Sequence, residues 1–519
     1  MDRLREALKE LEESDYYPFH MPGHKRRTEK EESNHPFLKD ITEIDGFDNL
    51  HHPEGIIKSE QEFAAKAFGA EESFFLVNGS SCGVLAAIAA VSADSDKKIL
   101  MGRNAHKSAY NGLYFANVRA DYLYPEKIQG VSFSGAIRPE NVLEAVNGDT
   151  LYSAVFLTSP TYEGVACDVE KICETAHKKS IPVIVDEAHG AHLGLWGGDG
   201  YFPKGALCQG ADIVIESLHK TLPAMTQTAI LHVQGKLIDR EKLKLYLAMF
   251  QSSSPSYVFL ESISSCIHFC KENEEKLLKD YKKRLQDFYK RTKDLAYLEI
   301  LTPSLINRFS GGRIKIEKDP GKIIIGVGKS GFDGKGLYDI LREKYHLQME
   351  MAAMDYVIAM TSVMDTEEGF ERLIGVLKEI DLQSPSQKEV MKDGKQPEEK
   401  AAKTESACPA GEVSVKTESA CSAGEMPAKT EAVYSIREAL SKTSSSVDFD
   451  KCAGQISGEF IYLYPPGIPV IAPGERISEE LLMYLEESVR TGLSVQGLRD
   501  YEHKKIFCIQ DESFERINE

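Results

Sequence analysis

The sequence predicts an α/β fold: a mostly parallel sheet with helices on both faces, followed by smaller α+β domains. Between Phe74 and Val233, short apolar runs alternate with helical patterns, and this alternation is typical of such a sheet. The runs are FFLVN, KILM, DYLY, AVFLTSP, PVIVDEAH, DIVIESLHK and AILHV. Ligands of these sheets bind at the C-terminal ends of the strands, so the residues that follow each run are the first candidates for a site.

The remaining sequence divides into further units. Residues 1–15 have the pattern of a charged amphipathic helix, and the large domain is expected over residues 16–256. Residues 257–383 contain a long helical stretch, the runs KIIIGV and YVIAMT, and a last amphipathic segment. They therefore predict a linking helix and a small α+β domain.

A linker and a C-terminal domain complete the predicted organisation. Residues 384–432 contain no Phe, Trp, Tyr, Ile or Leu, and the motif KTESAC occurs there twice. Such a segment cannot bury a core, so a disordered linker is expected. Apolar patterning returns in residues 433–519, which predict a small C-terminal domain.

Composition excludes several classes of protein. The 62 Lys and Arg residues against 81 Asp and Glu give a net charge of −19, which disfavours a nucleic-acid or membrane partner and suits a small cationic substrate. The ten cysteines form no CxxC pair, so a zinc site or redox motif is not indicated. No apolar stretch is long enough for a signal peptide or a membrane span, and we expect a cytoplasmic protein.

Two charged residues follow predicted strands. Lys220 comes just after the run DIVIES, where a lysine can be a structural charge, a phosphate ligand or an imine-forming nucleophile. Asp186 ends the run PVIVD, where it can be a metal ligand, a helix cap or the partner of a pyridine nitrogen. Pyridoxal phosphate requires both a lysine that binds it as an imine and an acid that keeps its ring protonated.

A possible phosphate site precedes these residues. Asn78, Gly79, Ser80 and Ser81 lie between the run FFLV and the helical pattern CGVLAAIAAV. A turn of small residues at the start of a helix directs free backbone N–H groups and the positive end of the helix dipole toward an anion. The same sequence also suits an ordinary turn and helix cap.

Three histidines lie near these elements. His106 can be a packed structural group or can lie flat over a cofactor ring. His189 can bind a phenolic oxygen of the cofactor or a substrate carboxylate, and His219 can bind the phosphate; structural roles remain open for both.

A metal site is the competing interpretation. His20 and His24 are four residues apart, and Asp186, Glu187, His189 and His192 are close in sequence. However, Pro22 and Gly23 interrupt a helix over the first pair, and the second group has no HExxH pattern. We therefore expect no metal.

Together, eight sequence blocks resemble the Orn/Lys/Arg decarboxylases, which belong to the aspartate aminotransferase-like pyridoxal-phosphate enzymes of fold type I. In chain order, the blocks are HMPGHKR, DITEIDGFDNLHHPEG, NGSSCG, RNAHKS, SPTYEG, VDEAHGAH, ESLHKTL and YPPGIPVIAPGE. Long members carry an N-terminal wing domain, whereas about twenty residues precede the first block here. A homodimer or a dimer of dimers, with sites at the subunit interface, is therefore the expected assembly.

The resemblance implies a role for each candidate residue. Lys220 would bind pyridoxal 5'-phosphate as an imine, Asp186 would face the pyridinium nitrogen and His106 would stack on the ring. Ser80 and Ser81, with Ser217 and His219, would bind the phosphate. The expected reaction is loss of the α-carboxylate as carbon dioxide and protonation of Cα by Lys220 or a histidine.

The substrate's distal cation requires acidic partners. Glu163, Glu350 and Glu459 lie in or beside the matching blocks and are the candidates, although each can equally be a surface carboxylate. Arginine, giving agmatine, is favoured slightly over lysine and ornithine. The alternatives are another fold-type I enzyme, such as an aminotransferase or an α-oxoamine synthase, and a non-catalytic cofactor-binding regulator.

Overall fold

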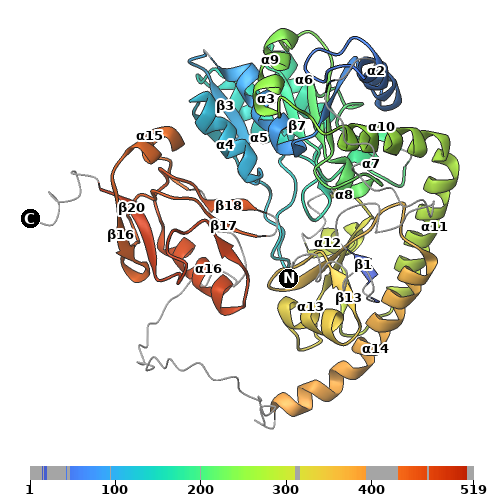
Figure 1. The fold of residues 1–519 in the computed structure, drawn as a ribbon. Coiled ribbons are helices and arrows are strands. Elements are labelled where there is room, and N and C mark those ends of the chain that lie inside the picture. Colours follow the sequence, from blue (N-terminus) through green and yellow to red (C-terminus); the bar gives the residue numbers. More distant parts are fainter. Residues whose placement is uncertain are drawn as a thin grey trace, which may run out of the picture.

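The computed structural model shows three units, coloured along the chain in Figure 1. It describes residues 15, 17–19, 43, 47–93, 95–198, 200–309, 316–392, 430–464 and 467–510. The predicted N-terminal helix, the block HMPGHKR with His20 and His24, and residues 393–429 of the predicted linker lie outside the described residues.

The large domain contains the predicted sheet. Its seven strands have the order β2-β9-β8-β7-β5-β3-β4, and every predicted apolar run forms one of them. Within this sheet β9 alone is antiparallel to its neighbours, so the prediction of a mostly parallel sheet is confirmed. The strands are β2 (Glu72–Leu76), β3 (Lys98–Gly102), β4 (Ala120–Leu123), β5 (Tyr152–Thr158), β7 (Val183–Asp186), β8 (Ile213–Glu216) and β9 (Ala229–Val233).

Helices cover both faces of this sheet. Helix α3 is apolar all round, because it packs between the sheet and a second layer that includes α4. Gly112 of α4 permits the close approach, since a Cβ there would lie 2.8 Å from Cδ1 of Ile88. The helices of this domain are α2 (Ile56–Phe68), α3 (Gly79–Ser92), α4 (Lys107–Ala116), α5 (Pro139–Asn147), α6 (Val169–His177), α7 (Ala191–Trp196), α8 (Leu218–Thr221) and α9 (Arg240–Phe250).

Two helices, α10 (Tyr257–Glu272) and α11 (Glu274–Thr292), lead from the large domain to the small domain along one edge of the molecule (Figure 1). The runs KIIIGV and YVIAMT form the antiparallel strands β12 and β15, as predicted. Helix α14 continues to Lys392, so the predicted boundary at residue 383 is too early. None of the helices in the described ranges is long and apolar enough to span a membrane. The further elements are α12 (Pro303–Phe309), α13 (Gly334–Glu343), α14 (Glu367–Lys392), β1 (Tyr17–Phe19), β6 (Val165–Ala166), β10 (Glu299–Ile300), β11 (Glu317–Lys318), β12 (Lys322–Gly326), β13 (Leu347–Met349), β14 (Met351–Ala352) and β15 (Tyr356–Met360).

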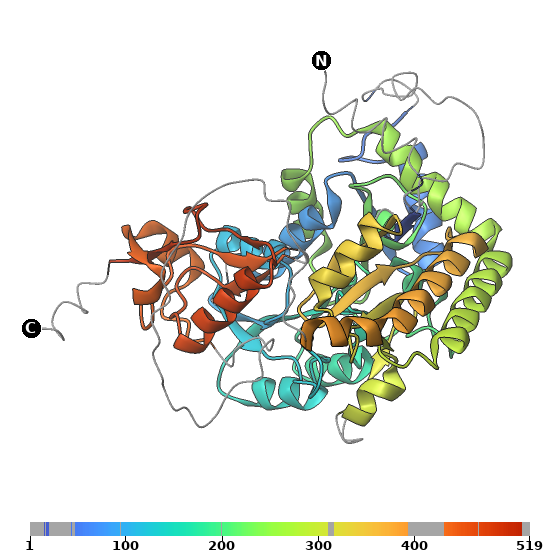
Figure 2. The same ribbon diagram turned by 90° about the horizontal axis from the view of Figure 1, so that it is seen from below.

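The C-terminal unit is a small α+β structure that lies beside the β3–α4 region in both views (Figures 1 and 2). Its Ile436 and Ala472 join the apolar cluster that contains Ile88 and Leu113 of the large domain. The elements are α15 (Ile436–Ser441), β16 (Ser444–Asp448), a 3₁₀ turn (Phe449–Lys451), β17 (Ile461–Leu463), β18 (Ile468–Ile471), α16 (Glu479–Arg490), β19 (Val495–Gln496) and β20 (Lys505–Ile509).

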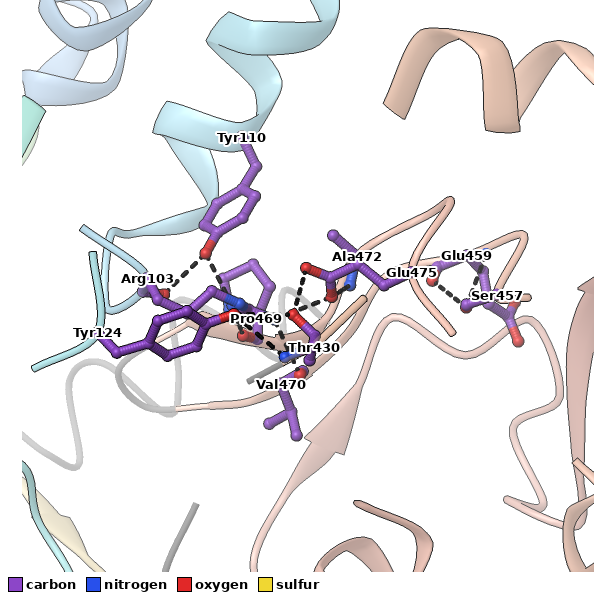
Figure 3. A network of polar contacts seen from close by, with 10 residues as sticks. All are labelled: Arg103, Tyr110, Tyr124, Thr430, Ser457, Glu459, Pro469, Val470, Ala472 and Glu475. Atoms are coloured by element: carbon purple, nitrogen blue, oxygen red, sulfur yellow. Dashed lines mark hydrogen bonds and ion pairs between the residues drawn. The ribbon is translucent and has the colours of Figure 1, made fainter. Parts of the chain in front are cut away.

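A buried ion pair joins the C-terminal unit to the large domain (Figure 3). Nη2 of Arg103 lies 3.0 Å from Oε2 of Glu475, and both side chains are at most 3% exposed. Arg103 also donates to the carbonyl oxygens of Pro469 and Val470, at 2.7 and 3.0 Å. Oε1 of Glu475 accepts from Oγ1 of Thr430 at 2.9 Å. The ordered C-terminal unit therefore includes Thr430, which the sequence assigned to the linker.

Arg103→Ala leaves the Glu475 carboxylate buried without its cation, and we expect it to weaken docking of the C-terminal unit by about 3–5 kcal/mol. Hydrogen–deuterium exchange of peptides around residues 468–475 would then be much faster than in the wild type. Arg119, which bonds Glu438 at an exposed position of the same interface, is the matched control, and Arg119→Ala should cost less than about 1 kcal/mol. Equal exchange rates in the two variants would contradict the role of the Arg103–Glu475 pair in docking the C-terminal unit.

Candidate active site

Three neighbouring strands of the large sheet end at one cavity. Thr158 ends β5, Asp186 ends β7, and Ser217 follows β8; Thr158 and Asp186 are paired in the sheet register. The cavity has a volume of about 420 Å³. Its lining includes most of the predicted site residues: Gly79, Ser80, Ser81, His106, Asp186, His189, Ser217, His219, Lys220 and Glu350. Residues up to half the chain apart in sequence thus meet at the C-terminal ends of the strands, where ligands of such sheets bind.

Lys220 and Asp186 both line the cavity. Burial lowers the pKa of Lys220, although the charges of Asp186 and Glu350 oppose this effect. Burial raises the pKa of Asp186, while the charge of Lys220 and the N–H of Ala188 favour the ionised carboxylate. The Ala188 N–H binds Oδ1 at 3.1 Å. A carboxylate this buried is stabilised by a facing cation.

The histidines of the cavity have defined hydrogen-bond partners. Nδ1 of His106 accepts from the backbone N–H of Ser108 at 3.2 Å, because His106 is the N-cap of α4. Burial lowers its pKa to about 3, so the ring is neutral and carries its proton on Nε2. Nδ1 of His219 donates to the carbonyl oxygen of Thr228 at 2.9 Å. Nε2 of His189 lies 3.0 Å from Nζ of Lys220.

One end of the cavity is built for an anion. Gly79 has a φ of +77°, which lets the chain turn from β2 into α3. The hydroxyl of Ser217 donates to that of Ser80 at 3.0 Å, so hydroxyls from two strand ends meet at the start of a helix. Free N–H groups, the helix dipole and hydroxyls are the elements of a phosphate site.

Three of the predicted residues, Asn78, Glu163 and Glu459, do not line this cavity. Asn78 is exposed, and its Oδ1 accepts from the backbone N–H of Ser252. Glu459 lies within the C-terminal unit, where its carboxylate accepts from the backbone N–H groups of Arg499 and Phe507, both at 2.9 Å. Glu459 therefore holds two loops of that unit together, and the geometry gives it no place beside a substrate bound within this chain.

The other two predicted carboxylates extend the cavity. A second cavity of about 370 Å³ shares Glu350 with the first and contains Glu163. Glu350 accepts a hydrogen bond from the hydroxyl of Tyr162, and Glu163 accepts one from the hydroxyl of Tyr356 at 3.0 Å. Burial raises the pKa of Glu163. The two acids thus line two adjoining cavities, called here the acidic path, that share Glu350 as a lining residue.

The sequence did not single out several residues of the cavity. Thr158 and Asn104 line it, and their side-chain oxygens are buried without a hydrogen-bond partner among the described residues. Tyr464 and Ile468 enter it from the C-terminal unit. Thr158 ends a strand, as Asp186 does, so its position in the sequence indicates a place at the site. The contribution of Tyr464 depends instead on how the domains dock.

The residues considered for a metal site are separated in the fold. Glu187 accepts from the backbone N–H of Ala206, whereas Nε2 of His192 lies 3.1 Å from Oδ2 of Asp319. Asp186 and His189 face the cavity instead. Across the described part of the chain, no group of three or more His, Cys, Asp or Glu side chains could hold a metal ion.

The cavity has the polar groups that pyridoxal phosphate requires. The anion end with Gly79 and Ser80 suits its phosphate, and Asp186 suits its ring nitrogen. The partnerless oxygens of Thr158 and Asn104 show that the cavity contains polar groups for which the described chain supplies no partner. The residues present therefore fit this cofactor.

Comparisons with known proteins agree with this chemistry. The family described as Orn/Lys/Arg decarboxylase, major domain, matches residues 3–317, and its C-terminal domain matches residues 416–500. The chain is 30% identical to the arginine decarboxylase of Halalkalibacterium halodurans over 95% of this chain and 94% of that protein. It is 28% identical to the arginine decarboxylase of Bacillus subtilis over 95% of both chains.

The fold also has solved relatives. The lysine decarboxylase of Francisella novicida superimposes with a TM-score of 0.71 at 20% identity, covering 89% of this chain and 73% of that chain. This similarity confirms the fold-type I architecture that the sequence predicted.

Proposed function

The chain belongs to the Orn/Lys/Arg decarboxylase family, and from this premise we propose that it decarboxylates arginine to agmatine with pyridoxal phosphate bound at Lys220. Decarboxylation of a basic amino acid is the activity of the family. One observation supports the proposal for this chain: the cavity that contains Lys220 and Asp186 shares Glu350 with an adjoining cavity that contains Glu163. Two relatives that match nearly the whole chain are arginine decarboxylases, and this supports arginine as the substrate.

Each residue of the cavity has a binding role in this proposal. Lys220 would hold the cofactor covalently, and the N–H groups at the start of α3 with the hydroxyls of Ser80 and Ser217 would bind its phosphate. Asp186 would pair with the ring nitrogen and keep it protonated. When bound, pyridoxal phosphate supplies a ring that accepts the electron pair of the broken Cα–carboxylate bond.

The neutral histidines suit the walls of such a site. His106 cannot become a cation near neutral pH, since burial lowers its pKa to about 3, so it offers a flat apolar face without repelling a protonated ring. Both Nε2 of His189 and Nζ of Lys220 lie in the cavity, 3.0 Å apart. These two atoms can hold the proton that Cα receives after carbon dioxide leaves.

The acidic path would bind the far end of the substrate. A guanidinium presents five N–H donors in a plane, which suits two carboxylates in adjoining cavities better than a compact ammonium group. An arriving cation would also favour ionisation of Glu163, whose pKa burial raises. The expected homodimer or dimer of dimers stays a prediction.

Lys220→Ala tests the covalent role. We expect the variant to lose the visible absorbance of the bound cofactor and all carbon dioxide release from arginine, because no other amine replaces Nζ. Absorbance and mass spectrometry after borohydride reduction report the bond. A yellow, active Lys220→Ala protein would refute the assignment.

Asp186→Asn tests the partner of the ring nitrogen. The amide keeps the shape of the side chain but loses the charge, so the visible band should remain while kcat falls about 10²–10³-fold, the usual loss for one electrostatic contact to the transition state. Steady-state kinetics on the fully loaded variant provide the measurement. Near-normal turnover would remove Asp186 from this role.

Glu350→Gln tests recognition of the distal cation. Loss of a charge-assisted hydrogen bond costs about 1.5–3 kcal/mol, so KM for arginine should rise about 10–100-fold. Glu459→Gln is the matched control, because Glu459 lies outside both cavities, and KM should stay unchanged. If Glu459→Gln raised KM and Glu350→Gln did not, the path would be wrongly placed.

A further inference from the structure

A lysine of the small domain lies beneath the candidate active site. Lys322 begins β12, directly after the turn Asp319–Gly321 that connects it to β11, and its side chain is 0% exposed. Nζ of Lys322 lies 2.9 Å from Nδ1 of His189. Because Nε2 of His189 lies 3.0 Å from Nζ of Lys220, the imidazole connects two lysines from different domains.

The surrounding structure makes room for this lysine. Gly164 has a φ of +91°, and a Cβ there would lie 2.8 Å from Cγ of Lys322. Nζ of Lys318 donates to the backbone oxygens of Asp319 and Lys322, which ties the turn together. The position of Lys322 is therefore fixed by backbone on both sides.

The hydrogen-bond inventory restricts the protonation states. An ammonium group has donors only, and a neutral imidazole has one N–H and one acceptor nitrogen. His189 is neutral, because burial and the charges of Lys220 and Lys322 lower its pKa well below the ordinary value. Only one of the two lysines can then donate to the ring as a cation, and the other must accept the ring N–H as a free amine.

The hydrogen bonds fit either lysine as the cation, and the proposed chemistry selects one. Lys322 faces Asp319, whose pKa is kept below its usual range mainly by His192 and also by Lys322, against the effect of burial. Lys220 faces Asp186 and Glu350, yet burial still lowers its pKa. Because imine formation at Lys220 requires the free amine, the proposed function assigns the cation to Lys322.

The remaining groups around His189 do not reverse this choice. His106 and His219 also face the ring and add only positive charge if protonated. The ring of Tyr162 packs against it with centroids 4.6 Å apart, and burial raises the pKa of the Tyr162 hydroxyl well above its ordinary value. No carboxylate within the described residues forms a hydrogen bond to either nitrogen of His189.

We propose that Lys322 is a positioning residue that donates to Nδ1 of His189, fixes the ring proton on Nε2 toward Lys220, and so keeps Lys220 a free amine ready to bind the cofactor. This inference rests on the proposed function. Capture joins Nζ of Lys220 to the aldehyde carbon and releases one water, and it requires the unprotonated amine. The positive charge of Lys322, behind the imidazole, disfavours protonation of Lys220 at neutral pH.

The test is the pH dependence of cofactor capture by the full chain freed of cofactor. The rate at which pyridoxal phosphate develops its visible band is measured from pH 6 to 10 for the wild type, Lys322→Met and Lys322→Arg. Lys322→Met removes a positive charge, so the pKa of Lys220 rises and the midpoint should move up by about one pH unit, equal to about tenfold slower capture below both midpoints. Lys322→Arg should restore the wild-type midpoint.

Lys318→Met is the matched control. It removes a second buried lysine of the same turn, whose pKa burial lowers to about 8, but Lys318 bonds backbone oxygens rather than His189. Its capture profile should keep the wild-type midpoint. An unshifted Lys322→Met profile, or an equal shift in Lys318→Met, would overturn the proposal.

A second measurement needs no variant at Lys322. In the full chain labelled with ¹⁵N-histidine, the signals of His189, identified by their loss in His189→Gln, should show a protonated Nε2 and a bare Nδ1. The opposite tautomer would overturn the proposal even if Lys322→Met failed to fold. Failure of the wild type to bind pyridoxal phosphate or release carbon dioxide would instead overturn the proposed function.

Discussion

The buried ion pair between Arg103 and Glu475 is the constraint on which the candidate active site depends. It holds the C-terminal unit against the end of β3, and the carbonyl oxygen of Gly467 then accepts from the N–H of Lys107 at 3.1 Å. Gly467 also lies against the ring of His106, since a Cβ there would be 3.4 Å from Nε2. A buried ion pair of this kind contributes more to a specific arrangement of the two units than to stability. Here that arrangement places Tyr464 and Ile468 in the wall of the cavity.

The sequence predicted most of the large domain and the base of its site. Continuous apolar runs and intervening amphipathic helices leave few topologies, and these topologies place functional residues at the C-terminal strand ends. Asp186, Ser217 and Lys220 follow β7 and β8 directly, so their proximity required no knowledge of side-chain packing. Local sequence also determined the anion end at Gly79, because a positive φ before a helix is a local property.

Contacts between domains were beyond the reach of sequence patterns. Lys322 stands in the segment KDPGK, which by itself describes a surface turn, and it is buried because it packs against Gly164 and His189 of the large domain. Glu459 showed the opposite error: it lies in a sequence block beside the active-site blocks, but its carboxylate caps backbone N–H groups within the C-terminal unit. The path from Glu350 to Glu163 likewise exists only after the three units assemble.

The most direct test is carbon dioxide release from arginine, lysine and ornithine, each supplied separately to the purified full chain loaded with pyridoxal phosphate. Two adjoining cavities that share Glu350, one with Lys220 and the other with Glu163, predict the highest kcat/KM for arginine. Release from lysine or ornithine alone would contradict the assignment of the acidic path to a guanidinium. If protein in which Lys220 carries the cofactor released carbon dioxide from none of the three amino acids, decarboxylation itself would be contradicted.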